Sequence, residues 1–345
     1  MLLEIDFDYL LLWGHYRLMA GLHERLQGRL SHPRLQSLSL GNLGSAYGHL
    51  GQAQKAIACH QQALVIDREI GNRQWEGTDL GNLGNRYAAL GQTARAIEYY
   101  EQALAIACEI GDRRGEGTDL GNLGSCHAGL GQTTRAIEYH EQALAVAREI
   151  GNRRGEGIYL DNLAEALVDQ GRYGEAIQRA LESVEIGEEI GSPDLGSFNN
   201  GCLALAHLCA GDLAAARAAA ETARQYDVPQ NNHYALALLG IIALRQGDGA
   251  AAQEAFAAAV AQADALLAHT PQYFNALDSR GLALCGLALC EARNLVSEAV
   301  AAYRAARAIN RDAGVVGRVL HLFDALAAVD TAGVLAGVRA AANNS

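Results

Sequence analysis

The chain has 345 residues and carries 39 acidic against 27 basic side chains, a formal net charge of −12. Nucleic-acid binding needs a basic surface, so this charge balance argues against a nucleic-acid partner. No stretch of about 18 uncharged apolar residues occurs, so no membrane-spanning segment is expected. A chain of this length would form two or more globular domains unless its core runs along a line.

Residues 1–34 are expected to form an atypical N-terminal helical repeat. The segment is apolar, but Glu4, Asp6 and Asp8 stand at its front. A secretory signal peptide would have a basic start and an unbroken apolar run, so none is predicted. We therefore expect a cytoplasmic protein.

Residues 35–194 are expected to hold four regular copies of a 40-residue repeat. Residues 81–120 and 121–160 are identical at 29 of 40 positions, and more diverged copies begin at Gly41 and Asp161. Self-similarity at a fixed period of this length indicates a stacked-repeat architecture. Each copy is too small to bury its own apolar face, so neighbouring copies must cover it.

Each copy is predicted to contain two helices, helix A (113–130 in one copy) and helix B (132–150). Breaks are expected at Gly111-Asp112 and Gly131, because glycine is preferred just past a helix end and aspartate is a preferred N-cap. Apolar residues recur at steps of three and four in both helices, and no segment alternates with the period of two that a strand shows. The short turn between the helices makes them an antiparallel hairpin.

Helix A contains Gly117, Gly121 and Gly124, although glycine inside a helix costs about 1 kcal/mol relative to alanine. Gly124 is expected where helix B brings Ala136 close. Two interpretations of Gly121 stay open. Its backbone packs closely against helix A of the next repeat, or it is exposed to a bound peptide.

The C-terminal half is less regular. We expect three diverged, alanine-rich repeats over residues 195–312 and C-terminal capping helices over 313–345. The spacing slips in this half, because Gly247 follows Gly211 sooner than the regular period would place it. Proline is tolerated at helix starts and turns but not inside helices, and all four prolines stand at such expected positions: Pro33, Pro193, Pro229 and Pro271.

The repeat resembles the tetratricopeptide repeat family, in which small residues stand where helices A and B touch and large residues surround them. The family's usual proline after helix B is absent, since Arg68, Cys108 and Arg148 stand there, and this helps to explain why the repeat is longer than is usual in the family. The resemblance implies an all-α fold, an α-solenoid in which antiparallel helix hairpins form a right-handed superhelix. The pattern recurs in register as Leu43, Gly44, Tyr47, Ala56, His60 and Ala63, as Leu83, Gly84, Tyr87, Ala96, Tyr100 and Ala103, and as Leu123, Gly124, His127, Ala136, His140 and Ala143.

The long variant, with phrases such as NLGNRYAALGQ and EIGDRRGEG, is similar to two groups of tetratricopeptide proteins. One comprises kinesin light chains and cell-polarity adaptors, which bind peptides in a concave groove. The other is the sensor arm of bacterial STAND-type signalling ATPases, whose end the C-terminal half resembles. The second resemblance implies a bacterial signalling protein, with an ATPase or effector segment upstream of Met1.

The tetratricopeptide pattern places one set of helix A side chains on the concave face. An asparagine column recurs once in every copy, and an amide can both donate to and accept from a peptide backbone. In the competing interpretation, each asparagine bonds to the adjacent helix and fixes the repeat spacing. The predicted peptide-binding residues are Asn42, Thr78, Asn82, Asn85, Thr118, Asn122, Ser125 and Asn162.

Arginines cluster at the start of helix A. They are candidates for a charge clamp on acidic groups of a partner. In the competing interpretation they pair with Glu76, Glu116 and Glu156 nearby. The cluster comprises Arg73, Arg113, Arg114, Arg153 and Arg154.

No catalytic residue, cofactor or metal site is expected. The sequence has no G-x-x-x-x-G-K-[ST] phosphate loop, no H-E-x-x-H and no G-x-S-x-G. The seven cysteines are odd in number and form no C-x-x-C. We expect small buried thiols in a reducing cytosol, with zinc or disulfide roles as the alternative.

The sequence thus predicts a non-enzymatic solenoid that binds a peptide or protein segment, as a sensor or scaffold arm of a bacterial signalling protein. The alternative is a structural protein without a dedicated ligand, in which near-identical repeats stack between chains as a homo-oligomer.

Overall fold

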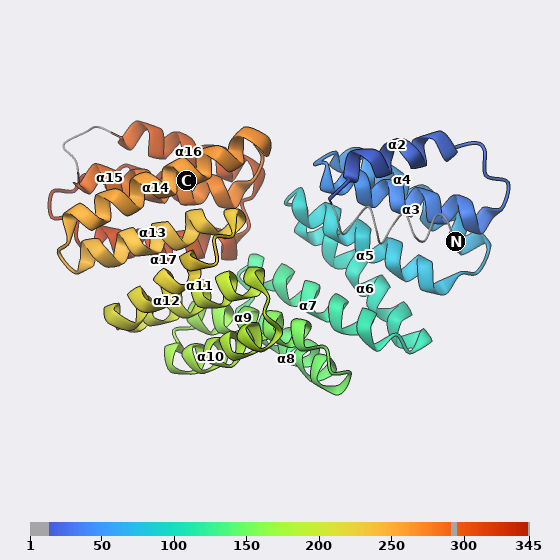
Figure 1. The fold of residues 1–345 in the computed structure, drawn as a ribbon, viewed down its shortest axis with the longest axis horizontal. Helices are drawn as coiled ribbons and strands as arrows, with labels where there is room; N and C mark the ends of the chain where they lie inside the picture. The colour runs from blue at the N-terminus through green and yellow to red at the C-terminus, as the bar shows by residue number, and fades with distance from the viewer. Residues whose placement is uncertain (1–13, 291–294, 344–345) are drawn as a thin grey trace. The chain divides into compact units, whose positions relative to one another are not determined.

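The computed structural model describes residues 14–290 and 295–343 (Figure 1). The first 13 residues of the predicted atypical repeat lie outside the described part, and the rest of that segment contains helix α2. Within the described ranges the chain forms helices and no strand, which confirms the all-α prediction. The helices are α2 (Tyr16–Leu26), α3 (Pro33–His49), α4 (Ala53–Glu69), α5 (Arg73–Ala89), α6 (Thr93–Ile110), α7 (Arg113–Gly129), α8 (Thr133–Glu149), α9 (Arg153–Asp169), α10 (Tyr173–Ile190), α11 (Pro193–Ala210), α12 (Leu213–Gln225), α13 (Pro229–Arg245), α14 (Gly249–His269), α15 (Phe274–Cys290), α16 (Val296–Ile309), α17 (Ala313–Ala327) and α18 (Val338–Ala342).

Glycines set the helix boundaries. One stands at the end of every helix from α3 to α11, from Gly51 through to Gly211, and each has a positive φ between 61° and 86°. Glycine adopts this left-handed conformation without the steric cost that a side chain brings. The next residue then bonds back to the helix it has left, as when Asn72 N–H donates to the Asp67 carbonyl at 2.8 Å. A new helix starts at once, so the chain runs back and forth in consecutive pairs (Figure 1).

The chain divides into two compact units, Met1–Cys126 and His127–Ser345. In the first unit, α3 and α5 are helices A, α4 and α6 are helices B, and α7 begins the third helix A. A cluster around Met19, Leu43 and Ala46 joins α2 to the first repeat. Gly81 lies close to the next helix A, because a Cβ added there would be 3.5 Å from Asp119 Oδ1. Gly121 is itself buried, so the packing interpretation of this glycine column is the one the structure favours.

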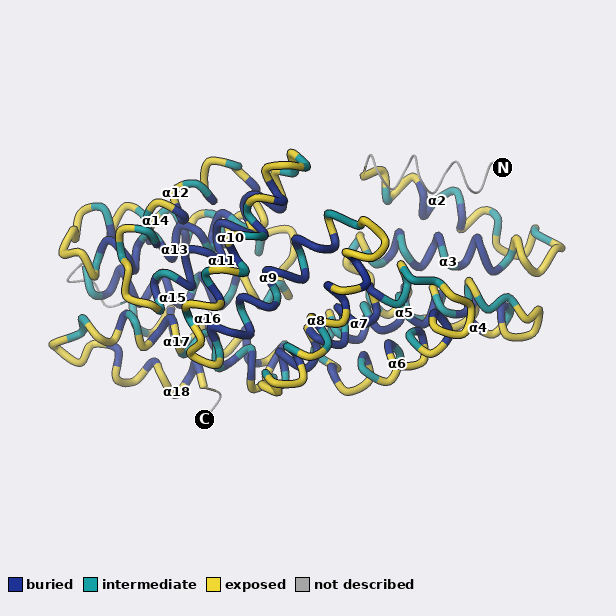
Figure 2. The backbone as a smooth tube through the Cα atoms, turned by 90° about the horizontal axis from the view of Figure 1, so that it is seen from below, coloured by how far each residue is buried: buried dark blue, intermediate teal, exposed yellow. Residues whose placement is uncertain are grey.

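In the second unit, α9, α11, α13 and α15 are helices A and form the inner layer. Twelve of the 18 residues of α11 are buried, against four of the 21 residues of α14, a helix B (Figure 2). One apolar cluster runs from Ala164 to Ala342 through these helices. Helix α17 packs against α13 and α15, and it adds Leu322, Phe323 and Leu326 to that cluster.

The cysteines follow the prediction only in part. All seven lie in the described part of the chain and none is joined in a disulfide there, and Cys126, Cys202 and Cys285 are buried as expected. Cys108 is exposed, at a position of α6 where the neighbouring copies have arginine.

Candidate functional site

A groove of about 280 Å³ lies in the first unit, between α5 and α7. It collects five of the eight residues that the sequence predicted for peptide binding, together with one residue of the arginine cluster. Ser125 is exposed but does not line the groove, Asn42 is buried on α3, and Asn162 belongs to α9 in the second unit. The predicted residues in the groove are Thr78, Asn82, Asn85, Thr118, Asn122 and Arg114.

The asparagine amides in this groove are open. Asn82 and Asn122 are half-buried, and their side chains make no hydrogen bond with any described residue. The same holds for Asn162 in the second unit. Hydrogen bonding to a neighbouring helix therefore does not account for the asparagine column at these three positions. Asn85 differs, because its Oδ1 accepts a hydrogen bond from Tyr100 Oη at 2.8 Å.

The hydroxyl groups are turned back to their own helix. Thr78 Oγ1 donates to the Gln74 carbonyl at 3.0 Å, and Thr118 Oγ1 donates to the Arg114 carbonyl at 2.9 Å. Ser125 makes the same bond to Gly121. Each hydroxyl keeps lone pairs that can accept a further hydrogen bond.

Three of the five clustered arginines form ion pairs with glutamates of the chain. Arg73, Arg113 and Arg153 each donate to the next glutamate on their own helix, at 2.5 to 2.6 Å. Arg73 and Arg153 also pair with Glu109 and Glu189.

The remaining two arginines differ from each other. Arg154 donates to Ser192 Oγ at 3.1 Å. Arg114 is exposed and lines the groove, and its guanidinium makes no hydrogen bond or ion pair with the described residues. Most of the clustered arginines therefore pair with glutamate, as the competing interpretation holds. Arg114 is the basic side chain among the described residues that line the groove.

A buried carboxylate stands among these groups. Asp119 lines the groove, yet its exposed fraction is only 7%. Burial raises the pKa of Asp119 to about 7, and the nearby Asp112 carboxylate adds to the shift. No sequence pattern singles out this residue, because an aspartate on helix A looks like any solvated charge until its burial is known.

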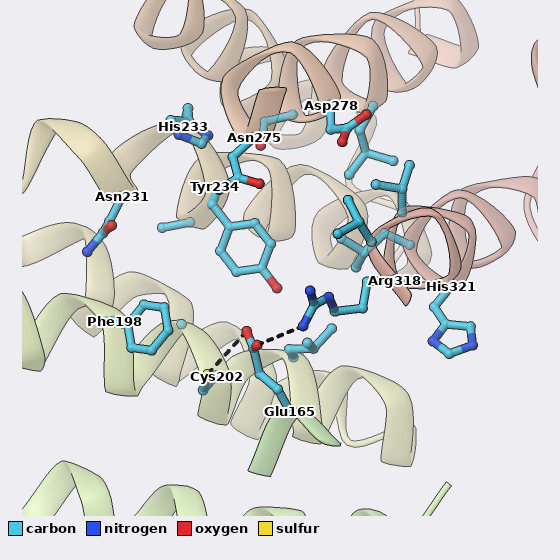
Figure 3. Close-up of a pocket in the computed structure, with 18 of the residues that line it drawn as sticks. Glu165, Phe198, Cys202, Asn231, His233, Tyr234, Asn275, Asp278, Arg318 and His321 are labelled. Atoms are coloured by element: carbon cyan, nitrogen blue, oxygen red, sulfur yellow. Dashed lines mark hydrogen bonds and ion pairs between the residues drawn. The ribbon is translucent and has the colours of Figure 1, made fainter. Parts of the chain in front are cut away.

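A second cavity, of about 300 Å³, lies in the second unit between the inner helices and α17 (Figure 3). Phe198, Tyr234 and Tyr273 supply aromatic surface, and Asn231 and Asn275 supply amides. The hydroxyl of Tyr234 points toward Arg318 and Glu165, a charged pair that also lines the cavity (Figure 3). Such a mixture suits a ligand that has both apolar and hydrogen-bonding groups.

The charged pair joins α17 to α9. Arg318 Nη1 donates to Glu165 Oε2 at 3.2 Å, and Glu165 also accepts from Cys202 Sγ at 3.7 Å (Figure 3). Glu165 is the counterpart of Ser125 in the following repeat, in the column that the sequence assigned to the concave face. In the second unit, helix α17 therefore covers part of this face.

His233 and Asp169 line this cavity, and the pKa of each is shifted. Burial lowers the pKa of His233 to about 4, so this ring is neutral at neutral pH. Burial raises the pKa of Asp169 to about 6, although Arg318 and His321 oppose the shift. Within the described ranges, no group of three or more His, Cys, Asp or Glu side chains is arranged to hold a metal ion. None of the described helices is both long and apolar enough to cross a membrane.

Among curated proteins, no sequence matches this chain. A family model described as tetratricopeptide repeat matches residues 35–109 and 118–189. The apo form of the quorum sensor NprR from B. thuringiensis is similar in structure, with 14% identity and a TM-score of 0.63 over 92% of this chain and 86% of that one. A Rap protein complexed with Competence and Sporulation Factor has 14% identity and a TM-score of 0.61, covering 94% and 97% of the two chains.

A STAND signal-transduction ATPase from Pyrococcus horikoshii, which carries a tetratricopeptide repeat sensor, is also similar. It has 18% identity and a TM-score of 0.61 over 77% of this chain, which spans 41% of the length of that protein. Structural similarity at such low sequence identity establishes the fold alone. The in-register repeat pattern, the paired helices and the family match together show that the part of the chain matched by the family model is built of tetratricopeptide repeats.

Proposed function

We propose that this protein is a non-enzymatic interaction module that holds an extended polypeptide segment of a partner against its helices A. The observation that carries the proposal is the pair of amides, Asn82 and Asn122, which line the groove of the first unit and have no partner among the described residues. An amide side chain can form hydrogen bonds through both its NH₂ group and its oxygen with a ligand that supplies an acceptor and a donor, as a peptide backbone does.

The repeat geometry supports an extended ligand. Packed helices lie about 8 to 10 Å apart, so equivalent amides on successive helices A are separated by about that distance. An extended chain advances about 3.3 Å per residue. Successive asparagines would therefore meet the ligand backbone about every third residue, which leaves the side chains between these points to determine specificity.

The similar structures support a role in sensing. They are a quorum sensor, a Rap protein with its bound factor and a STAND protein with a tetratricopeptide repeat sensor. We propose accordingly that the chain acts as the sensor or scaffold arm of a signalling protein.

The test uses short random peptides displayed on phage and selected on the full chain. Selected peptides are synthesised, and their affinity is measured for wild type and for the Asn82→Ala, Asn122→Ala double variant. Each hydrogen bond is worth about 0.5–1.5 kcal/mol, so the double variant should bind about tenfold more weakly. Circular dichroism should be unchanged, because these amides make no hydrogen bond that the fold uses.

The matched control replaces amides on the outer helices. Gln102 on α6 and Gln142 on α8 are exposed and bond only to carbonyls of their own helix. Gln102→Ala with Gln142→Ala should leave the affinity at the wild-type value. Equal affinities of the double variant and this control would remove these two asparagines from the binding surface, and a wild-type chain that selects no peptide would refute the proposed function.

A further inference from the structure

Asp119 is the least exposed charged group that lines the groove of the first unit. It lies on α7, and only 7% of it is exposed. Its carboxylate reaches α5, since Oδ1 would lie 3.5 Å from a Cβ added at Gly81. The carboxylate makes no hydrogen bond or ion pair with any residue that the structure describes.

The preceding repeat shows what is missing at Asp119. Asp79 occupies the equivalent position there, and its Oδ1 is paired with His60 Nδ1 at 2.8 Å. The residue equivalent to His60 is Tyr100, whose hydroxyl donates to Asn85 and not to Asp119. The change from histidine to tyrosine thus leaves Asp119 without the partner that its counterpart has.

The surroundings of Asp119 do not replace that partner. Tyr100 and Cys108 are the titratable groups that face it from α6, and Asp112 faces it from the turn before α7. All three are neutral or acidic. Arg114 lines the same groove but makes no ion pair with Asp119. A buried charge without a partner is costly, so this site is arranged to gain from a positive group that comes from outside.

We propose that Asp119 receives a cationic nitrogen group of the bound segment, an ammonium or a guanidinium, while Asn82 and Asn122 hold the backbone on either side of it. This inference rests on the proposed function and names the chemical class of sequence that the groove selects. A basic side chain that enters between α5 and α7 would exchange its hydration for a charge-assisted hydrogen bond to a desolvated carboxylate.

Binding of a cation at Asp119 should depend on pH. The pKa of Asp119 is raised to about 7 in the free protein, so the carboxyl is partly protonated near neutrality. A cation binds the ionised form, so a proton is released on binding. The affinity should rise from about pH 5 to about pH 8 and then level off.

The experiment uses peptides selected as described above at about pH 8, each made with a free and with an acetylated N-terminus. Affinities are measured for wild type, Asp119→Asn and Glu101→Gln, the last as a control that removes an exposed carboxylate from α6 outside the groove. We expect the selected peptides to be enriched in lysine and arginine. Asp119→Asn should weaken binding about tenfold, as for a lost hydrogen bond to a charged group, and should abolish the rise with pH.

The two sets of variants distinguish this inference from the proposed function. Selected peptides without a basic residue, or equal affinities of Asp119→Asn and Glu101→Gln, would overturn the inference while the asparagine variants still test the function. If acetylation alone abolishes binding, the cation is the peptide N-terminus and not a side chain. The substitution should not prevent folding, because it removes an unpaired buried charge, and thermal unfolding followed by circular dichroism checks this point.

Discussion

A glycine in the middle of helix A makes room for an aromatic ring of helix B. A Cβ added to Gly84 would lie 2.6 Å from Cε1 of Tyr100, and the same relation joins Gly44 to His60 and Gly240 to Phe256. In each of these pairs the ring comes from the helix that directly follows the glycine's own helix. The cost of glycine in the helix is offset by the burial of a ring that no other residue at this position would permit.

Gly84→Ala should therefore destabilise the protein, although alanine is the better helix former. Overpacking costs about 1–3 kcal/mol and outweighs a gain of about 1 kcal/mol in helix propensity. Gly21, in α2, is the matched control, because a Cβ added there meets nothing within 4 Å. Thermal unfolding should show a lower midpoint for Gly84→Ala and an equal or higher midpoint for Gly21→Ala. A rise in both midpoints would show that the ring moves aside at little cost.

The contact between glycine and ring shows which contacts of single residues could be predicted from the sequence. The repeat pattern identified Gly44 and Gly84 as sites of close helix contact. The structure adds that the rings of His60 and Tyr100 from helix B lie beside these two glycines. The repeat period placed the asparagine column on helix A. Whether the buried Asp119 has a partner depends on which side chain stands at position 100, and no pattern within one helix shows that.

At the scale of whole helices, the regular part of the chain was predictable and the C-terminal part was not. The recurring glycines set the helix bounds of the repeats closely, as for α7 (Arg113–Gly129) against the predicted 113–130. The contact of α17 with α9 joins residues 153 positions apart, Arg318 and Glu165. A repeat pattern predicts contacts between neighbouring copies only, so neither this contact nor the cavity beneath α17 could be inferred.

Helix α17 should be held by its apolar side chains and not by its ion pair. Phe323 is 1% exposed in the core of the second unit, and replacing a buried phenylalanine with alanine costs about 3–5 kcal/mol. Arg318 and Glu165 are both partly exposed, and such pairs contribute about 0–1 kcal/mol. Urea unfolding should therefore shift strongly to lower concentration for Phe323→Ala and slightly for Arg318→Ala. A larger effect of Arg318→Ala would mean that the salt bridge positions the helix.

At the scale of the whole molecule, the two units differ in how they are built. Both units have glycine–ring contacts, but the first unit also joins its helices through pairs of buried polar groups, such as Ser37 with Asp67 and His60 with Asp79. The second unit has a continuous apolar cluster that includes Leu238, Ile241 and Phe256, all fully buried. In a stacked-repeat protein each repeat is stabilised mainly by its neighbours, so stability can differ along the chain.

Amide hydrogen exchange should accordingly be slower in α11, α13 and α15 than in α3 and α5. Burial of apolar surface contributes about 25 cal/mol per Å², and the inner helices of the second unit bury more large aliphatic side chains than those of the first. The buried carboxyl of Asp67 adds to the contrast. Burial raises its pKa to about 6, so its contribution to stability falls as the pH rises from about 4 to about 6.

Exchange measured by mass spectrometry at two pH values, after correction for intrinsic rates, tests both statements. At neutral pH, α3 and α5 should show lower protection than α11, α13 and α15. Asp67→Asn should raise the protection of α3 and α5 at neutral pH but not near pH 4. Phe323→Ala is the control for the second unit, because it should lower protection in α13 and α15. A single rate of exchange shared by α5 and α13 would mean that the chain opens as one cooperative body, and the nearest-neighbour account of its stability would then be wrong.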